Sequence, residues 1–179
     1  MNGGTSTGDA AGDTYTNIER IFGTGHDDII LGGGDDDILL GNGGDDFLTG
    51  GLGDDTLIGG AGVDSFGYDE AVDGADVISG FTLNETVFIL GGLVTDFASL
   101  QALGTDAGAN TIFDFGFGNT LTIVGHNLAD LDADNFDFGG TSSIVVSESS
   151  DALSALESIN DSFAFASEVE FLFDIDALI

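Results

Sequence analysis

Large apolar side chains recur at every ninth position over one stretch of the chain, from residue 23 to residue 67. Five nine-residue units fill this stretch, with the sequences GTGHDDIIL, GGGDDDILL, GNGGDDFLT, GGLGDDTLI and GGAGVDSFG. The eighth place of each unit holds a large apolar residue, namely Ile30, Leu39, Leu48, Leu57 and Phe66. A fixed short period predicts a solenoid, in which each unit buries its apolar side against its neighbours.

Each unit divides into a turn and a short strand. The first six residues are rich in Gly and Asp, which suits a turn that needs positive φ, and the last three are apolar or β-branched, which suits a strand. Alternating strands and turns predict a flattened coil with two units per circuit. Successive units then lie in two parallel sheets, and the eighth-place side chains point inward between them. The expected fold class is therefore all-β, a β-solenoid.

The sixth place of every unit is an aspartate, and the five are Asp28, Asp37, Asp46, Asp55 and Asp64. With two units per circuit, Asp28, Asp46 and Asp64 form one column, and Asp37 and Asp55 form a second. Carboxylates about 5 Å apart repel by a few kcal/mol at an effective dielectric constant of ~20, and a hard cation between the turns reverses that sign. Calcium takes six to eight oxygen ligands in irregular geometry, whereas magnesium demands a strict octahedron.

Three well-formed calcium sites are expected, between Asp28 and Asp46, Asp46 and Asp64, and Asp37 and Asp55. Two weaker sites flank them, Glu19 with Asp37 and Asp55 with Asp76, so the chain has room for five ions or more. Backbone carbonyl oxygens at the first and third places of each turn would complete the metal sites, and these residues are Gly23, Gly25, Gly32, Gly34, Gly41, Gly43, Gly50, Leu52, Gly59 and Ala61. Zinc or copper would need His or Cys, and the chain has two His and no Cys.

Two other features of the turns have separate interpretations. The fifth-place acids are expected to face water and to raise the local calcium concentration, and they are Asp27, Asp36, Asp45 and Asp54. His26 and Asp35 stand at fourth places where Gly is expected, and both residue types tolerate a left-handed backbone better than most. We therefore expect these two turns to form but to bind the cation less tightly.

Charge narrows the function further, because 33 acidic residues face a single base, Arg20, for a net charge of -32. Nucleic acid is excluded as a partner, and anionic membrane surfaces are disfavoured, since both need Lys and Arg. Yet 42% of the residues are apolar, including 15 Phe, which is too many for ordinary disorder. No apolar run approaches ~18 residues, so no membrane insertion is expected. The composition predicts a chain that folds only when a divalent cation supplies the counter-charge.

Four segments are expected along the chain. Residues 1–13 would be a flexible lead, without the pattern of a cleavable signal peptide. Residues 14–80 would form the calcium-binding coil, with an entry coil at 14–22 and an insertion at Tyr68–Glu70. Residues 81–140 would form a β-rich cap with strands at 86–90 and 110–115, a hairpin after residue 116 and a short helix at 97–103, while 129–138 is ambiguous. Residues 141–179 would form a tail with a strand at 143–146 and a helix at 151–160.

The units GGLGDDTLI and GGAGVDSFG resemble the nonapeptide repeat of the RTX, or hemolysin-type, calcium-binding family. The segments NIERIFGTGHDDI, DVISGFT, NTLTIVG and LADLDADNF also resemble family sequence, so the similarity extends over residues 14–138. The resemblance implies a parallel β-roll, calcium in the turns and folding triggered by calcium. It also implies export from bacteria by type I secretion machinery through an uncleaved C-terminal signal, which the tail would contain. The protein would then be secreted, and would lie in the medium or at the cell surface.

The favoured function is a secreted, non-catalytic calcium-binding protein or module that folds after export and acts as a structural or assembly element. Catalysis is disfavoured because Cys and Lys are absent and His is rare. A pair of cap carboxylates is conceivable as a catalytic site, but solvated loop acids are the expected role of these residues, namely Asp114, Asp132, Asp134 and Asp137. One alternative is the C-terminal export and folding module of a larger secreted lyase, epimerase, protease or adhesin. We expect no attached catalytic domain in this chain, unlike many members of the family.

Another alternative is a subunit of a self-assembling extracellular layer or fibre. The seventh and ninth places should face outward, and in the early units they are apolar: Ile29, Leu31, Ile38, Leu40 and Phe47. An exposed apolar face of this kind is expected to be covered by another segment of the chain or by another molecule. The Phe-rich tail of the same chain, or of a neighbouring copy, is the expected cover.

Overall fold

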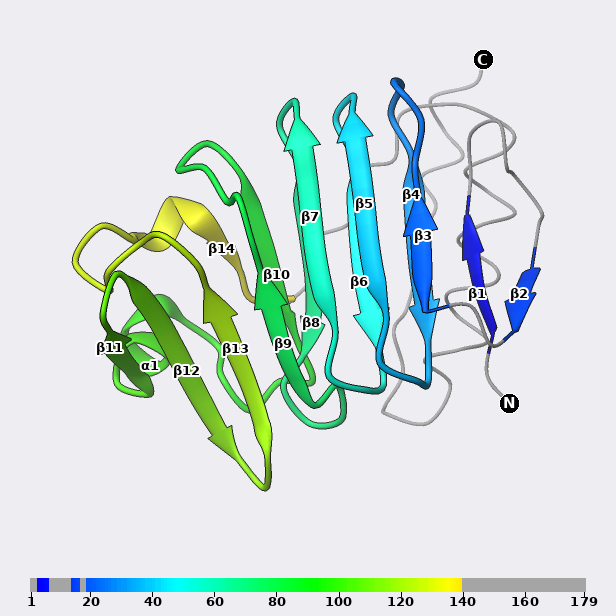
Figure 1. Ribbon diagram of the computed structural model, residues 1–179. Helices are drawn as coiled ribbons and strands as arrows, with labels where there is room; N and C mark the ends of the chain where they lie inside the picture. The colour runs from blue at the N-terminus through cyan, green and yellow to red at the C-terminus, as the bar shows by residue number, and fades with distance from the viewer. Residues whose placement is uncertain (1–2, 7–13, 17–18, 140–179) are drawn as a thin grey trace, which may run out of the picture.

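The computed structural model describes residues 3–6, 14–16 and 19–139, which form two facing sheets of seven strands each (Figure 1). The first sheet has the order β14 (Phe136–Asp137), β10 (Thr86–Leu90), β8 (Ser65–Asp69), β6 (Phe47–Gly51), β4 (Ile29–Gly33), β1 (Gly3–Ser6) and β2 (Thr14–Thr16). The second has the order β11 (Gly104–Ala107), β12 (Asn110–Gly116), β13 (Asn119–Ile123), β9 (Ala75–Ile78), β7 (Thr56–Ala61), β5 (Ile38–Gly43) and β3 (Arg20–Phe22). The all-β solenoid predicted from the sequence is confirmed.

Successive units alternate between the two sheets, as the nine-residue period predicts. Ile30 in β4 lies opposite Leu48 in β6, and Leu48 lies opposite Phe66 in β8, each pair 18 residues apart in a parallel register. In the other sheet, Ile21 of the entry coil lies opposite Leu39. These eighth-place side chains are buried between the sheets. Two units therefore complete one circuit, and the core is a stack of like residues.

Two of the three residues inserted after residue 67 extend strand β8 instead of forming a loop outside the sheet. Tyr68 and Asp69 continue β8, where they lie opposite Ile89 and Leu90 of β10. The Tyr68 side chain is buried, and its hydroxyl donates to the carbonyl oxygen of Gly74 at 3.0 Å. The extra residues thus add an aromatic ring to the core, which the sequence pattern did not indicate.

Strand stacking continues beyond the last recognisable repeat. β10 runs parallel to β8, and β13 runs parallel to β9, so the coil extends by a further circuit. The cap then follows, with α1 (Phe97–Gln101), the strands β11 to β13 and the 3-10 helix η1 (Ala133–Asn135). The expected strands, hairpin and short helix are all present, although the helix ends two residues early. Asp96 begins it, by accepting from the backbone N–H of Ser99 at 2.7 Å.

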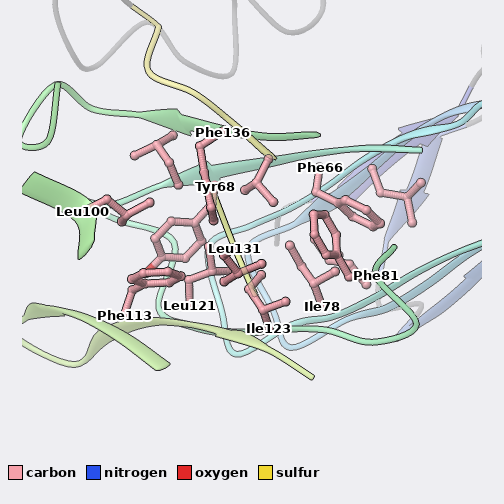
Figure 2. Close-up of a cluster of buried hydrophobic side chains, with 14 of the residues drawn as sticks. Phe66, Tyr68, Ile78, Phe81, Leu100, Phe113, Leu121, Ile123, Leu131 and Phe136 are labelled. Atoms are coloured by element: carbon pink, nitrogen blue, oxygen red, sulfur yellow. The ribbon is translucent and has the colours of Figure 1, made fainter. Parts of the chain in front are cut away.

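The cap closes one end of the coil with a cluster of large side chains (Figure 2). Phe136 of β14 contacts the rings of Phe97 and Phe113, with centroids 5.6 and 5.7 Å apart. Tyr68 packs against Phe115 in the same region, at 5.3 Å. The segment 129–138, which was ambiguous in sequence, supplies Phe136 and so belongs to this core. The end of the coil is therefore covered by packed aromatic residues.

The opposite end of the first sheet differs from the expectation of a flexible lead. Residues Gly3–Ser6 form β1, which pairs antiparallel with both β4 and β2 (Figure 1). Backbone pairing of β1 occupies the free edge of β4 and so extends the sheet. Residues 1–2, 7–13, 17–18 and 140–179 lie outside the described residues. The strand, the helix, the Phe-rich cover and the secretion signal expected within 141–179 therefore lie outside them too.

The outward apolar residues of the early units are half-buried, and they are Ile29, Leu31, Ile38, Leu40 and Phe47. Phe47 contacts Phe88 of β10 on this face, with ring centroids 6.1 Å apart. Phe22 lies opposite Leu40 in the neighbouring strand and is more exposed, and Leu93 and Phe117 are exposed in other segments. Among the described residues, no helix has the length and hydropathy needed to cross a membrane.

Candidate metal centre

The sixth-place aspartates lie at the two edges of the coil, where each turn enters its strand. All of them are buried, together with the acid in the equivalent place after the insertion: Asp28, Asp37, Asp46, Asp55, Asp64 and Asp76. The exposed fraction of Asp64 is 0%. A buried carboxylate is costly unless hydrogen bonds or a cation compensate for its lost hydration, so the partners of these oxygens decide what the turns can bind.

Hydrogen bonds join the aspartates of the first column from turn to turn. The backbone N–H of Asp28 donates to Oδ1 of Asp46 at 2.8 Å. The backbone N–H of Asp46 donates in turn to Oδ1 of Asp64 at 3.0 Å. The structure therefore brings together both predicted pairs of this column.

The second column is built in the same way. The N–H of Asp37 donates to Oδ1 of Asp55 at 2.6 Å, and the N–H of Asp55 donates to Oδ1 of Asp76 at 3.0 Å. Asp76 thus stands in register although it follows Asp55 by 21 residues. Glu19 lies beside this column, since its carbonyl oxygen accepts from the N–H of Ile38 at 2.9 Å, but its side chain is exposed. Pairing of the Glu19 carboxylate with a cation stays a prediction.

The other carboxylate oxygen is buried without a hydrogen-bond partner in four of these residues: Asp46, Asp55, Asp64 and Asp76. In the turns of the first three, this Oδ2 lies so close to the first-place glycine that an added Cβ would overlap it; these glycines are Gly41, Gly50 and Gly59. A Cβ at Gly41 would also lie 2.6 Å from the carbonyl oxygen of Gly59, in the next circuit. Oxygen atoms from two circuits thus face one buried, anionic niche, and this donor set fits a hard cation such as Ca²⁺.

In the first turn, by contrast, Oδ2 of the sixth-place aspartate has hydrogen-bond partners. Oδ2 of Asp28 accepts from the backbone N–H of Thr24 at 2.6 Å and from its hydroxyl at 2.9 Å. In the third unit the second place has a left-handed backbone, with φ of 75° at Asn42, and the corresponding places of the next two units follow it with 93° at Gly51 and 119° at Gly60. The later turns therefore leave Oδ2 open, whereas the first turn closes on it.

His26 and Asp35 do not have the left-handed backbone that their residue types would tolerate. Among the described residues, the non-glycine positions with positive φ are Asn42 and Phe117. His26 and Asp35 therefore accommodate the fourth place without left-handed backbone, because the first two turns have a different path from the Gly-containing ones. Both side chains are exposed.

The first-place carbonyls lie where the sequence places them, but the third-place carbonyls are partly used elsewhere. A Cβ at Gly23 would lie 2.5 Å from the carbonyl oxygen of Gly41 and 2.9 Å from Asp28 Oδ2. The carbonyl oxygen of Ala61, a third-place residue, accepts from the N–H of Gly44 at 3.0 Å. First-place glycines therefore line the niches, whereas ligation by the third-place residues stays a prediction; these are Gly25, Gly34, Gly43, Leu52 and Ala61.

The fifth-place acids are exposed, as expected, but they also bind backbone groups. The N–H of Asp45 donates to Oδ1 of Asp27 at 2.8 Å, and the N–H of Val63 donates to Oδ1 of Asp45 at 2.8 Å. Asp36 and Asp54 accept the corresponding bonds on the other edge. Sixth-place carboxylates accept from the preceding circuit, whereas fifth-place carboxylates accept from the following one. Each pair of stacked turns is thus held by two reciprocal bonds, which the sequence analysis missed.

Burial and like charges strongly perturb the carboxylates of the two edges. Burial raises the pKa of Asp46 to about 6, and the charges of Asp64 and Asp28 add to the rise. Burial raises the pKa of Asp55 to about 7, and the charge of Asp37 adds to the rise. Burial raises the pKa of Asp76 to about 9, and the charge of Asp55 adds to that rise. The ionised form of these carboxylates is therefore unfavourable without a cation, and a bound divalent cation would stabilise it.

The sequence analysis also missed buried acids outside the repeats, and these are Asp69, Glu70, Asp73 and Glu85. Burial raises the pKa of Asp73 to about 8, and the charges of Asp69 and Asp55 raise it further. In the described part of the chain, no three His, Cys, Asp or Glu side chains gather as a metal cluster. The niches described above need no such cluster, because each combines carboxylates with backbone oxygen atoms.

The cap carboxylates considered for catalysis serve their own turns. Asp114 accepts from the N–H of Gly116 at 2.8 Å, and Asp137 accepts from the N–H of Gly139 at 3.2 Å. Asp132 begins η1 by accepting from the N–H of Asp134. These bonds give the acids a structural role, and they provide no evidence for catalysis.

The chain is similar to a known repeat family and to solved structures. The family model for the RTX calcium-binding nonapeptide repeat, in four copies, matches residues 13–48 and 31–66. The solution structure of the AlgE6R3 subunit of the Azotobacter vinelandii mannuronan C5-epimerase is 29% identical, covering 72% of this chain and 82% of that subunit with a TM-score of 0.53. The extracellular lipase LipA of Serratia marcescens is 20% identical, covering 69% of this chain and 21% of that enzyme with a TM-score of 0.45. No curated protein sequence matches.

The repeat match covers both columns of aspartates from Asp28 to Asp64, and the epimerase subunit shares the fold beyond them. Repeats of this family bind calcium, which agrees with the oxygen-lined niches between the turns. Residues 13–66 therefore contain RTX calcium-binding nonapeptide repeats, and the two-sheet coil is a β-roll of the kind that such repeats form.

Proposed function

We propose that this chain is a secreted, non-catalytic module whose folding is driven by calcium, and that it acts as a structural element outside the cell. The single observation that best supports this function is the set of buried Oδ2 atoms without partners at Asp46, Asp55, Asp64 and Asp76. A stable metal-free fold would leave each of these groups desolvated and unsatisfied, at a cost of ~1–3 kcal/mol or more for a charged group. The turns are therefore built for a ligand.

Folding and ion binding are then one equilibrium. In the unfolded chain the stacked carboxylates are far apart and hydrated, so the sites do not exist there. When bound, Ca²⁺ supplies the positive charge that offsets the repulsion between stacked turns, and its binding free energy becomes folding free energy. The net charge of -32 works against compaction until that charge arrives.

This coupling suits a protein that folds after export. Extracellular-type calcium sites have dissociation constants of ~10⁻⁴–10⁻³ M, so they stay largely free of the ion at the low levels of the cytosol. We infer that the chain crosses the bacterial envelope unfolded, through type I secretion machinery, and folds outside. The family membership of its repeats supports this route and this location.

A role as a module of a larger secreted protein is the second candidate. The match to the AlgE6R3 subunit supports it, because it covers 82% of that subunit, which is itself part of an epimerase. The same calcium-dependent fold would serve either role. Self-association into a layer or fibre through the outer face of the early units stays a prediction.

A calcium titration followed by far-UV circular dichroism tests the proposed function. We expect a cooperative gain of β-type signal on addition of CaCl₂, reversal by EDTA, and a much weaker response to MgCl₂ at the same concentrations. Sedimentation in the same buffers would show the accompanying compaction. Identical spectra with CaCl₂ and with EDTA would contradict the proposal.

A further inference from the structure

The first column of acids continues past the last repeat. β10 pairs in parallel with β8, and the N–H of Thr86 donates to the carbonyl oxygen of Asp64 at 3.3 Å. One circuit earlier, the N–H of Ser65 donates to the carbonyl oxygen of Asp46 at 2.8 Å in the same way. Since Thr86 lies opposite Ser65, the residue before it, Glu85, stands in register with Asp64.

The segment around Glu85 has the length and the apolar eighth place of a repeat unit, but it lacks the glycine and aspartate pattern. In the sequence GFTLNETVF of residues 80–88, Gly80 takes the first place, Glu85 the sixth and the buried Val87 the eighth. This segment lies outside residues 13–66, which match the repeat family. A turn of unrelated sequence therefore places an acid where each repeat has Asp.

One carboxylate oxygen of Asp64 is bonded to the preceding circuit, and the other has no hydrogen-bond partner. Its Oδ1 accepts from Asp46, whereas its Oδ2 is buried and unbonded beside Gly59. In the turn of Gly41, the equivalent niche is shared with the first-place carbonyl oxygen of the next circuit, that of Gly59. The next turn of this column after Gly59 is the one that contains Glu85.

Glu85 is 2% exposed, so its carboxyl group is held inside this edge of the coil. Its Oε2 accepts from the N–H of Thr82 at 2.9 Å, which fixes the side chain within its own turn. Burial raises the pKa of Glu85, and the negative charge of Asp64 raises it further. The hydrogen bonds from Thr82 and the charge of His126 lower the pKa of Glu85, but burial outweighs them, so the ionised carboxylate lacks full compensation at this edge.

We propose a further calcium site between the turns 59–64 and 80–85, with Asp64 Oδ2 and the Glu85 carboxylate as its charged ligands. This site deepens the proposed function, on which it rests, and it extends calcium binding from the repeats into the cap. Closure of the cap over the coil would then depend on the same ion as the folding of the repeats.

Native mass spectrometry of the calcium-loaded chain counts the bound ions directly. We expect Glu85→Gln to bind one ion fewer than the parent chain, and Glu85→Asp, which restores the acid of the repeats, to keep the full number. Glu70→Gln is the matched control, because Glu70 is equally buried and its Oε2 also has no hydrogen-bond partner, but it lies outside both columns, with its Oε1 bonded to the N–H of Val94. We expect it to keep the full number as well.

The outcomes separate this inference from the proposed function. If the parent chain binds no calcium, both fail; if it binds calcium but Glu85→Gln keeps every ion, or Glu70→Gln alone loses one, only the extra site is overturned. If Glu85→Gln folds poorly, the slope of its folding equilibrium against the logarithm of calcium activity gives the number of ions taken up on folding. A slope lower by one ion than that of the parent supports the site, and an unchanged slope contradicts it.

Discussion

Each acidic turn places two neighbouring aspartates in different environments. Asp45 is exposed and holds the N–H of the next circuit, whereas Asp46 is buried and leaves Oδ2 open beside Gly41. The two neighbours differ in burial because successive side chains point to opposite sides as the turn enters the strand. The buried member is the one that a cation must neutralise.

Replacing Asp46 by Asn tests that division. Asn keeps an oxygen to accept from the N–H of Asp28, but it replaces the charged, open Oδ2 by a neutral amide. Since calcium affinity depends on the number of charged ligands, the calcium midpoint of folding should rise about tenfold or more. Circular dichroism in a CaCl₂ titration measures it.

Asp45→Asn is the matched control, with the same change of charge one residue away. Its oxygen can still accept from Val63, so we expect a midpoint within about twofold of the parent, the size of a surface electrostatic effect. Equal shifts in the two variants would show that general charge repulsion, and not a site at Asp46, controls folding.

Among the elements, the short strands gain their stability from stacking, since a strand such as β6 contributes a single large apolar side chain, Leu48, between the sheets. Leu48 lies between Ile30 and Phe66 in the same sheet and is fully buried. Strands of four to six residues have little stability alone, and each circuit depends on the ones beside it. A defect in one inner side chain should therefore weaken the whole coil.

Leu48→Ala should destabilise the calcium-loaded fold by about 2–5 kcal/mol, the usual range for emptying a buried leucine site. Urea unfolding in saturating calcium would measure the loss. Leu40→Ala, at a half-buried outward position, removes the same atoms and should cost clearly less. Similar losses in both variants would contradict the inward orientation of the eighth place.

The repeated elements could be predicted from sequence because every unit repeats the same physical requirements. An apolar residue at the eighth place and Asp at the sixth fix both the core and the columns, and the pairs Asp28–Asp46 and Asp37–Asp55 follow from a circuit of two units. The paired strands β12 and β13 were equally predictable, because alternating apolar residues flank a glycine-rich turn. Local pattern and tertiary structure agree in these segments.

Other features depend on partners that sequence does not reveal. Strand β1, with the sequence GGTS, has no apolar alternation, and it is a strand because the edge of β4 offers it backbone hydrogen bonds. Tyr68 enters the core because β10 extends the ladder beside it. Glu85 could be found only from the register of β10 on β8, since its turn has none of the repeat's glycines after Gly80.

At the scale of the whole molecule, folding buries carboxylates along both edges of the coil, and the repulsion between their negative charges opposes folding. The chain has a net charge of -32, and its buried acids lie in the two columns and at their junction with the cap. Protons and calcium are therefore two alternative means of neutralising the same groups. The pH dependence of stability should therefore have opposite signs in the metal-free and the calcium-loaded protein.

Without calcium, the free energy of unfolding should fall as pH rises from about 6 to 8.5. Burial raises the pKa of Asp55 to about 7, of Asp73 to about 8 and of Asp76 to about 9. The folded chain then holds more protons than the unfolded chain, whose Asp groups titrate near 4 and are already ionised in this window. The metal-free fold is thus stabilised by acid and weakened by base.

With saturating calcium, the sign should reverse, because the ion binds the deprotonated carboxylates and protons compete with it. The calcium-loaded fold should gain stability as pH rises through the same window. Urea unfolding at several pH values, in CaCl₂ and in EDTA, measures both slopes; an osmolyte such as sucrose keeps the metal-free fold populated. Slopes of the same sign in both buffers would mean that the buried carboxylates at Asp55 and Asp76 are not where calcium binds.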